Sequence, residues 1–490
     1  MTLVVLGALA LVLSYPPFPL PFLSFFALTP AVLLVRQSAQ AADPRGAFRW
    51  GWWYGLAANA LVLYWMVVAL WHFTPLSALG YLASIAVLGL ATGGLFWFVV
   101  RVRVAAPAVP LWLVFPVAWT TLEWLVGHLG DVSFPWLGLG TSLADAPVLV
   151  QWADIAGARG VTLWVAWCNV MIVEAASGEQ GAGSKWLRWR PALAVLATVV
   201  AALGYGVWRM RTLPVRDVGV VALIQPNEGF REKWEPGHKD SVFAKLVRMS
   251  RQSLARARPG LILWPEAAVP DVLTWRPGWE ARLAAQARAS HTPILAGTLY
   301  AERDFQQGDP YYNATLLMDS TGEWRNQPVY AKHYLVPVTE RVPFVPVRVF
   351  RAVPGLAQWS GGFSPGRSLP VYTTGLGRFG VLICYESAFE DFPRKYREQG
   401  ADFLVNVTND AWFGRTTAPY QHASHLVLRA IETRMGVARA ANSGISQFLD
   451  PLGRAYQSTA LDTEATVAGI LRTSDVLTVY VRMGDWVGTV

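Results

Sequence analysis

The sequence predicts a polytopic α-helical membrane domain followed by one large α/β domain. Hydrophobic residues make up 53% of the 490 residues, charged residues make up only 15%, and the mean hydropathy is +0.31, which exceeds what soluble domains of this size usually show. Apolar stretches of the length that crosses a membrane recur through residues 1–211. Residues 212–478 carry most of the acidic groups and alternate strand-like with helix-like stretches, which is typical of a single α/β domain.

The membrane domain is predicted from segments of mainly apolar residues, because a helix needs about 20 of them to cross about 30 Å of hydrocarbon. Candidate spans lie at about 2–14, 22–36, 51–71, 77–100, 109–126, 160–176 and 191–208. The first span is short and precedes a proline-rich turn, so a cleaved signal peptide is its alternative reading. It lacks a basic n-region and an A-x-A-like cleavage site, and we therefore expect it to be retained. About seven spans result.

The orientation of these spans follows from the basic residues in the short loops, because Lys and Arg are held on the cytoplasmic side. Alternate loops carry Arg36, Arg45 and Arg49, then Arg101 and Arg103, then Lys185, Arg188 and Arg190. The intervening loops 15–21, 72–76 and 127–158 have no Lys or Arg. Seven spans with the N-terminus inside therefore place the α/β domain on the extracytoplasmic side of the cytoplasmic (inner) membrane. An even number of spans would reverse this.

The α/β domain is predicted from runs of β-branched and apolar residues bounded by turn signals. Strands are expected at 218–226, 260–266, 292–300, 312–319, 378–386, 402–410 and 443–450, and helices near 237–257, 278–289, 389–399 and 419–436. There is no Walker A motif, no HExxH motif and no GxGxxG after a strand. The net charge of +8 comes without a dense Lys/Arg run, so no nucleic-acid partner is expected.

The first candidate for chemistry is Cys384, which ends the buried-type strand RFGVLIC just before a helical stretch. A nucleophile at such a turn faces backbone N–H groups that can hold an oxyanion. The alternative is that Cys384 is not a nucleophile and only packs in the apolar core, which is the commoner case for a lone cysteine in a strand. The other cysteine, Cys168, lies inside an apolar span, so a disulfide between the two is not expected.

Three charged residues accompany this cysteine in the sequence. Glu266 ends another apolar strand in GLILWPE, where its carboxylate could act as a general base. Lys332 lies in the apolar stretch VYAKHYLVPVTERVP, where it could stabilise an oxyanion, and Glu340 follows eight residues later and could pair with it. Taken singly, Glu266 is more often an exposed acid in a loop and Lys332 is more often a surface lysine. A pair between Lys332 and Glu340 is more often a surface salt bridge that contributes little stability.

Taken together, these motifs resemble the carbon-nitrogen hydrolase (nitrilase) superfamily, whose Glu-Lys-Cys triad falls on Glu266, Lys332 and Cys384. The multi-span leader, the KHYLVPVTE form of the lysine motif and the segment NVTNDAWFG at 406–414 make the chain similar to the apolipoprotein N-acyltransferases. The resemblance implies an α-β-β-α sandwich, with Glu266 as base, Lys332 as oxyanion stabiliser and Cys384 as nucleophile.

The same resemblance assigns further residues and a reaction. It implies that Glu340 is a supporting acid, that Tyr385 and Glu386 support the nucleophile, and that Trp234 in EKWEP binds substrate. The reaction it implies moves a fatty acyl group from a membrane phospholipid, through a cysteine thioester, to the N-terminal amine of diacylglyceryl-cysteine in apolipoproteins. This is the last step of bacterial lipoprotein maturation. It requires no cofactor or metal, and a monomer is expected.

The family usually closes with an eighth span, so residues 479–490 are expected to start a C-terminal segment that leads to a missing or incomplete last span. The main alternative function is a membrane-anchored amidase or nitrilase that hydrolyses a C–N bond, although a single anchor would suffice for it. A transporter with a sensor domain would need polar residues throughout the spans, where they are sparse. Aromatic loops at 270–279 and 355–366 are candidates for membrane contact or gating.

Two further groups of polar residues carry no predicted site. His422 and His425 have helical spacing suited to metal, but no third ligand of suitable spacing accompanies them. Glu123 and Glu174 lie within or near apolar spans, where an ionisable group is a functional candidate by default, although both could lie at the membrane interface.

Overall fold

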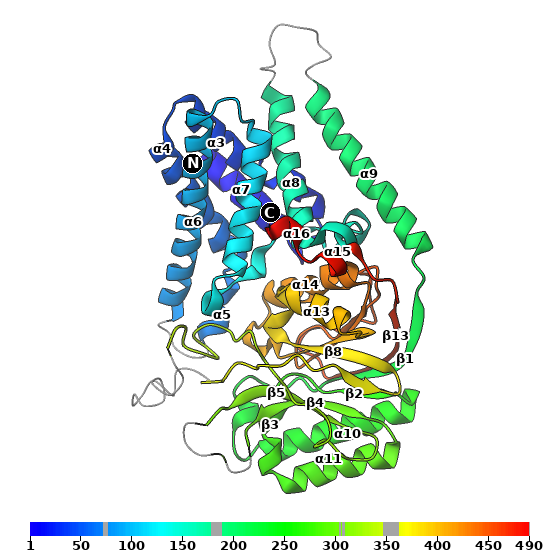
Figure 1. Cartoon of the computed structure of the whole chain (residues 1–490). Coiled ribbons are helices and arrows are strands. Elements are labelled where there is room, and N and C mark those ends of the chain that lie inside the picture. Colours follow the sequence, from blue (N-terminus) through cyan, green and yellow to red (C-terminus); the bar gives the residue numbers. More distant parts are fainter. Residues whose placement is uncertain (72–76, 178–188, 303–304, 306–308, 346–361, 490) are drawn as a thin grey trace. The chain divides into compact units, whose positions relative to one another are not determined.

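The computed structural model describes residues 1–71, 77–177, 189–302, 305, 309–345 and 362–489. The chain forms two compact units, one made of Met1–Leu129, Ser133–Thr212 and Asp485–Val490, the other of Gly130–Val132 and Leu213–Gly484 (Figure 1). The domain boundary that the sequence predicts between residues 211 and 212 lies one residue before the point where the first unit ends at Thr212 and the second resumes at Leu213. The expected C-terminal segment 479–490 holds two short helices, α15 (Val479–Met483) in the second unit and α16 (Trp486–Thr489) in the first.

The first unit is helical. Its helices are α1 (Thr2–Ser14), α2 (Ser24–Ala27), α3 (Thr29–Gln40), α4 (Pro44–Val62), α5 (Trp65–Trp71), α6 (Ser77–Ala105), α7 (Leu111–Gly127), α8 (Ala153–Ser177) and α9 (Arg190–Thr212). Large apolar side chains such as Leu82, Val87 and Leu90 of α6 are exposed, as expected of a surface that faces lipid. Helices suit this environment because they satisfy their own backbone hydrogen bonds.

The number of membrane spans stays a prediction. Among the described residues, four helical segments are long and apolar enough to cross a membrane: Pro21–Gln40, Ala78–Ala105, Ala153–Ser177 and Arg190–Thr212. A fifth results if α4 and α5, bent by 58°, form one span, whereas α1 and α7 are shorter apolar helices. All seven predicted spans thus coincide with helical segments. Of the basic residues that predict the orientation, Lys185 and Arg188 lie outside the described residues, and the orientation also stays a prediction.

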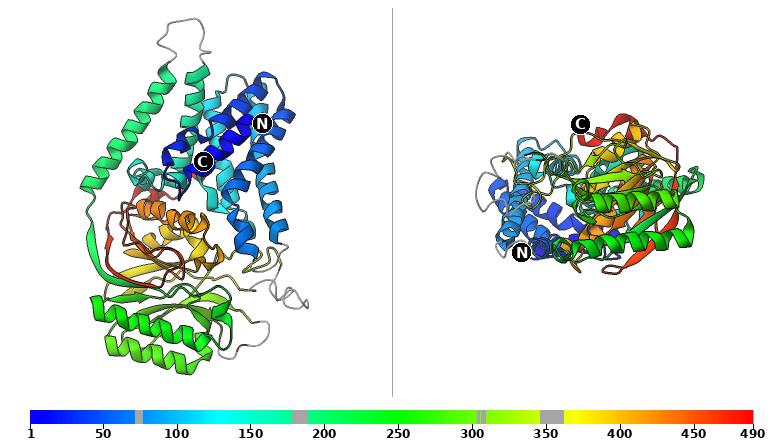
Figure 2. Two further views of the ribbon diagram at one scale, coloured as in Figure 1. Left: turned by 180° about the vertical axis from the view of Figure 1, so that it is seen from behind. Right: turned by 90° about the horizontal axis from the view of Figure 1, so that it is seen from below.

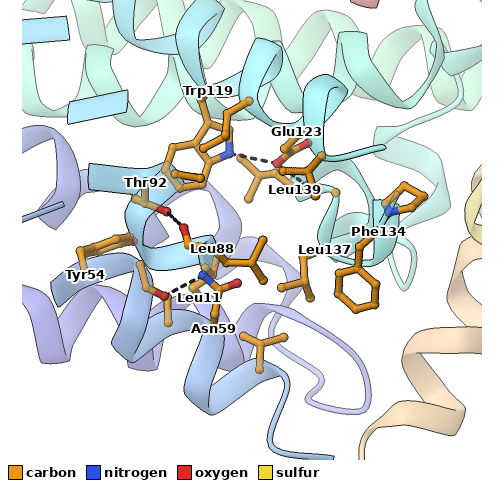
Figure 3. Close-up of a pocket in the computed structure, with 18 of the residues that line it drawn as sticks. Leu11, Tyr54, Asn59, Leu88, Thr92, Trp119, Glu123, Phe134, Leu137 and Leu139 are labelled. Atoms are coloured by element: carbon orange, nitrogen blue, oxygen red, sulfur yellow. Dashed lines mark hydrogen bonds between the residues drawn. The ribbon is translucent and has the colours of Figure 1, made fainter. Parts of the chain in front are cut away.

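A cavity of about 90 Å³ lies inside the first unit, lined mainly by apolar side chains (Figure 3). Glu123 of α7 borders it, and its carboxylate accepts hydrogen bonds from the Trp119 indole, the Leu139 backbone N–H and the Thr162 hydroxyl at 2.8–2.9 Å. The Arg159 guanidinium of α8 lies 3.4 Å from the same carboxylate. Glu123 therefore joins α7 to the following loop and to α8, which gives this acid a structural role.

Replacing Glu123 by leucine is expected to destabilise the first unit by about 3 kcal/mol, because Arg159 would lose its carboxylate inside an apolar domain. Thermal unfolding of the detergent-purified protein measures this loss. Glu123→Gln can still form hydrogen bonds with Trp119, Leu139 and Thr162, so it is expected to destabilise the unit less than Glu123→Leu does. A leucine variant as stable as the wild type would show that this acid holds nothing together.

The second unit contains two β-sheets. Within the described residues, the first sheet has the strand order β13-β1-β2-β4-β5-β6, with β3 paired to β4, and the second has the order β12-β11-β10-β9-β8-β7. The first-sheet strands are β1 (Arg216–Gln225), β2 (Leu261–Leu263), β3 (Val269–Val272), β4 (Ile294–Tyr300), β5 (Tyr312–Met318), β6 (Tyr330–Ala331) and β13 (Ala465–Thr473). The second-sheet strands are β7 (Tyr372–Thr374), β8 (Gly377–Ile383), β9 (Phe403–Thr408), β10 (Gly436–Ala441), β11 (Gln447–Leu449) and β12 (Ala455–Tyr456).

Each sheet is covered by helices on its outer face (Figures 1 and 2). Helices α10 (Lys239–Ala257) and α11 (Pro277–Ser290) pack on the first sheet through a buried core in which Phe243 stacks on Trp279 and meets the edge of Trp264. Helices α13 (Asp391–Glu398) and α14 (Ala418–Thr433) cover the second sheet. The four layers α-β-β-α confirm the predicted nitrilase-like fold.

The parallel pairing inside each sheet determines where a site can form. Strand β2 runs parallel to β1 and β4, and β8 runs parallel to β9, which is parallel to β10. Side chains that follow parallel strands therefore gather at one edge of the sheet. Glu266 comes after β2 and Cys384 comes directly after β8, so each lies at such an edge.

Candidate functional site

Cys384 occupies a strained position at the junction of β8 and the short 3₁₀ helix Cys384–Ala388. Its φ angle is +52°, in the left-handed region that a non-glycine residue rarely adopts, which costs about 1–2 kcal/mol. The side chain is 7% exposed. Backbone strain of this kind is maintained by the surrounding structure and gathers at functional sites.

Lys332, directly after β6, binds two buried carboxylates. Its Nζ donates to Oε1 of Glu266 at 3.1 Å and to Oε1 of Glu340 at 2.9 Å. The side-chain amide of Asn313 in β5 donates to the same two oxygens, at 2.7 Å to Glu266 and 3.1 Å to Glu340. All four residues are at most 4% exposed, so an ammonium and an amide together hold two carboxylates side by side in the interior.

The second oxygen of each carboxylate is held by the backbone. Oε2 of Glu266 accepts from the N–H of Asn409 at 2.9 Å, and Oε2 of Glu340 accepts from the N–H of Val336 at 2.7 Å. Asn409 comes directly after β9 of the second sheet, so Glu266 connects the two sheets at their common edge. Every oxygen of the pair therefore has a donor, and the carboxylates are fixed in orientation.

The electrostatics tie Cys384 to this cluster. Burial raises the pKa of the Cys384 thiol, Glu266 raises it further, and Lys332 acts in the opposite direction. Burial would lower the pKa of Lys332, but Glu266, Glu340 and Cys384 outweigh burial and raise it well above its usual value. The structure thus brings Glu266, Lys332, Glu340 and Cys384 together, with the sulfur protonated and the lysine charged near neutral pH.

Glu386 connects the turn that begins at Cys384 to the segment around Lys332. Its carboxylate is fully buried and accepts from the Tyr330 hydroxyl at 2.6 Å and from the backbone N–H groups of Ile383 and His333, both at 2.7 Å. One donor precedes Cys384 and the other two flank Lys332. Glu386 therefore holds the two segments in register and does not itself contact the Lys332 ammonium.

The pKa of Glu386 predicts a pH effect on stability. Burial raises this pKa to about 7, although Tyr330 and the backbone donors lower it in part. A carboxyl group whose pKa is higher in the folded state binds more protons there than in the unfolded chain, so its contribution falls as pH rises from about 4.5 to about 7. The difference in unfolding free energy between wild type and Glu386→Gln is expected to change by about 3 kcal/mol across this range, measured by chemical denaturation. A constant difference would contradict it.

The other two predicted residues are placed differently. Tyr385, in the 3₁₀ helix that begins at Cys384, is buried and meets the Phe389 ring edge-on at 5.2 Å. Trp234 ends the 3₁₀ helix Glu232–Trp234 and packs, partly exposed, against the buried cluster of Val272, Leu299 and Ala301. The aromatic segment 346–361 lies outside the described residues, so most of the predicted gating loop 355–366 does too.

The two histidines considered for metal lie in the interior of the second unit. His422 of α14 bonds the Asp410 carboxylate at 2.8 Å, and the Arg439 guanidinium contacts the same carboxylate at 2.8 Å. Burial opposes ionisation of Asp410, but Arg439 and His422 outweigh it and lower the pKa of this carboxyl to about 2. His422 thus takes part in a structural ion network.

Comparison with known proteins agrees with this geometry. The family model of carbon-nitrogen hydrolases matches residues 220–480, and that of the apolipoprotein N-acyltransferase N-terminal domain matches residues 7–171. An apolipoprotein N-acyltransferase of Geobacter metallireducens is 33% identical over 486 residues, covering 98% of this chain and 91% of the relative. The chain belongs to the apolipoprotein N-acyltransferase family. A second member, from Brucella melitensis, is 30% identical and covers 95% of this chain and 88% of its own length.

Among solved structures, Saccharomyces cerevisiae Nit3, of the nitrilase superfamily, covers 51% of this chain and 89% of its own, with 17% identity and a TM-score of 0.40. Membership of the apolipoprotein N-acyltransferase family identifies the chain as an N-acyltransferase of the carbon-nitrogen hydrolase superfamily. The apolar helices of the first unit fit a membrane location for such an enzyme.

Sequence reasoning missed two residues of the cluster, Asn313 and Asn409. Asn313 stands inside a correctly predicted strand, but its partner Glu266 is 47 positions away, and the bond from Asn409 to Glu266 spans 143 positions. Asn409 was part of the segment NVTNDAWFG that supports the family resemblance, so that motif gave an indirect signal for it.

Proposed function

We propose that this chain moves a fatty acyl group from a membrane phospholipid to the N-terminal amine of diacylglyceryl-cysteine in an apolipoprotein, through a thioester on Cys384. The observation that supports it most is the buried group of Lys332, Glu266 and Glu340 next to a strained cysteine, in a family member that carries apolar helices. An amine acceptor and a lipid donor both suit an enzyme that begins with a membrane domain.

In the first half-reaction, Glu266 takes the proton of the Cys384 thiol as the sulfur attacks the ester carbonyl of the phospholipid. The Lys332 ammonium and backbone N–H groups stabilise the oxyanion of the tetrahedral intermediate. The ester C–O bond breaks, the leaving oxygen receives the proton from Glu266, and lysophospholipid departs. Cys384 now carries the acyl group as a thioester.

In the second half-reaction, the free amine of the acceptor attacks the thioester carbonyl, and Glu266 takes a proton from that nitrogen. The C–S bond breaks, the sulfur receives the proton, and an amide remains on the lipoprotein. This ping-pong sequence uses only groups of the chain and its two substrates. Glu340 holds Lys332 in place, Glu386 holds the two segments together, and Trp234 contacts substrate.

The experiment incubates the purified protein with phospholipid labelled in its acyl chain and follows the label on Cys384. We expect a labelled protein from which hydroxylamine releases the label, and transfer of that label to a diacylglyceryl-cysteine peptide. Absence of labelled protein together with turnover of a soluble amide would favour the membrane-anchored amidase instead.

We also propose that the α/β unit works as a monomer on the extracytoplasmic side of the inner membrane, as the loop charges indicate. The Arg415 side chain is 82% exposed, so a cysteine at this position offers a label site on that unit. A membrane-impermeant maleimide is expected to label Arg415→Cys in intact spheroplasts. Labelling only after permeabilisation would place the unit in the cytoplasm.

A further inference from the structure

Lys233 is a second buried ammonium near the candidate site, and the proposed reaction does not use it. It precedes Trp234 in the 3₁₀ helix Glu232–Trp234 and is 1% exposed. Its Nζ donates to the backbone carbonyl of Ala267 at 3.2 Å and lies 4.9 Å from the centre of the Trp234 ring. In the described part of the chain, no carboxylate lies within ion-pair distance of it. An interior ammonium without a paired carboxylate is costly and calls for a reason.

The two contacts of Lys233 join two functional segments. Ala267 follows Glu266 directly and has a φ of +45°, so the turn that presents Glu266 is strained and its carbonyl is held by the Lys233 ammonium. Trp234 belongs to the loop proposed to contact substrate, and a desolvated cation over an indole is strongly attracted to it. One positive charge therefore links the Trp234 loop to the turn of Glu266.

This link depends on the charge of Lys233. Burial lowers the pKa of Lys233 to about 8, while Glu266, after β2, and Glu228, after β1, act in the opposite direction. Glu228 is itself bound by Lys245 at 2.8 Å and His238 at 3.2 Å. The lysine is therefore charged at neutral pH and becomes neutral not far above it. A neutral amine no longer attracts the indole face and binds the carbonyl more weakly.

We propose that Lys233 is a positioning residue for acyl transfer, whose ammonium holds the Trp234 loop against the turn that carries Glu266. The inference rests on the proposed role of Glu266 as the base for Cys384. It adds a residue outside the Glu-Lys-Cys cluster that controls how the base and the substrate loop are placed. Loss of this charge at alkaline pH also slows the first half-reaction, in which Cys384 is acylated.

The test measures single-turnover acylation of Cys384 by labelled phospholipid between about pH 6 and pH 9, without acceptor, so that the acceptor amine does not titrate. For the wild type we expect the rate to fall about tenfold as pH rises through about 8, a change that lies within the range expected from one cation–π contact. Lys233→Met keeps the length of the side chain and removes its charge. It is expected to be about tenfold slower at pH 7 and to show no fall near pH 8.

Two variants separate positioning from a merely structural role. Lys233→Arg keeps the charge at all pH values tested, so it is expected to retain more rate than Lys233→Met at pH 9. Lys239→Met, in which a lysine paired with Asp271 is lost nearby, is expected to leave the pH profile unchanged. Because burial of the Lys233 charge opposes folding, Lys233→Met is expected to melt at the wild-type temperature or above it.

The outcomes distinguish the inference from the proposed function. A Lys233→Met protein with the wild-type rate and the wild-type fall near pH 8 overturns the inference. A variant that loses rate only in proportion to a lowered melting temperature overturns it as well. If the wild type forms no acyl-Cys384 at any pH, the proposed function fails and the inference fails with it.

Discussion

Replacing Cys384 by alanine is expected to abolish the acyl-enzyme and to lower acyl transfer at least about a thousandfold. In the proposed mechanism the sulfur is the atom that forms the thioester, and neither Glu266 nor Lys332 can replace it as nucleophile. The side chain is buried at the end of β8, so solvent cannot supply a nucleophile in the same place. Hydroxylamine-sensitive label on the protein measures the acyl-enzyme, and label on a diacylglyceryl-cysteine peptide measures transfer.

The matched control is Cys168→Ser, which removes the other cysteine from the interior of α8 and is expected to keep both activities. Alanine retains Cβ, so Cys384→Ala keeps the left-handed strain at φ +52° and should unfold within about 1 kcal/mol of the wild type. Acyl label on Cys384→Ala in amounts equal to wild type would show that the thioester forms elsewhere and would remove the basis of the mechanism.

The strands that sequence predicted well are those buried on both faces. Runs such as GLILWPE and DFLVNVTND are mainly apolar between turn signals, and they contain β2 and β9. Strand β10, which lies between β9 and β11, was missed because its sequence GVARAA contains little except alanine and an arginine. That arginine, Arg439, is tolerated in the core because its guanidinium pairs with Asp410, 29 positions earlier, at 2.8 Å and also donates to Asn406 and to the carbonyl of Ile445.

The helix end before β10 was also predicted wrongly for a local reason. Residues 419–436 were read as one helix, whereas α14 ends at Thr433 and Arg434 takes a φ of +55°. Sequence signals for such an end rely on glycine or asparagine, which adopt this conformation readily. Arg434 is held there by tertiary contacts, among them a hydrogen bond from its guanidinium to the carbonyl of Pro451 at 3.0 Å.

The residues of the candidate site could be predicted from the sequence, whereas the contacts that hold them in place could not. Glu266, Lys332 and Cys384 each follow a strand, and the resemblance of their motifs to the carbon-nitrogen hydrolase superfamily brought them into one hypothesis. Asn313 and Lys233 could not be found in this way, because Asn313 bonds Glu266 47 positions away and Lys233 bonds Ala267 34 positions away, and both contacts depend on the packing of other segments. An amide within a strand or a lysine within a loop has no sequence pattern that distinguishes it from an ordinary one.

Replacing Lys332 by methionine is expected to have the second large effect, because it alters both activity and stability. Its ammonium is shared by Glu266 and Glu340, and without it two buried carboxylates face each other with only Asn313 between them. Removing one partner of a buried ionic group costs about 3–5 kcal/mol. Acyl transfer is expected to fall at least about a thousandfold, since the oxyanion loses its cation and the base loses its orientation.

The pH dependence of this variant gives the sharper test. With Lys332→Met, the two facing carboxyl groups bind a proton more tightly in the folded state than in the unfolded chain, so the folded state gains protons and stability falls as pH rises from about 5 to about 8. Adding Glu340→Gln is expected to restore stability at pH 8 without restoring transfer. Lys395→Met, which removes a half-exposed ammonium paired with Asp391, serves as the control and should change neither property appreciably. Lys332→Met with pH-independent stability would mean that the carboxylates of Glu266 and Glu340 do not repel each other in the folded protein, so the Lys332 ammonium would not be what holds the two together.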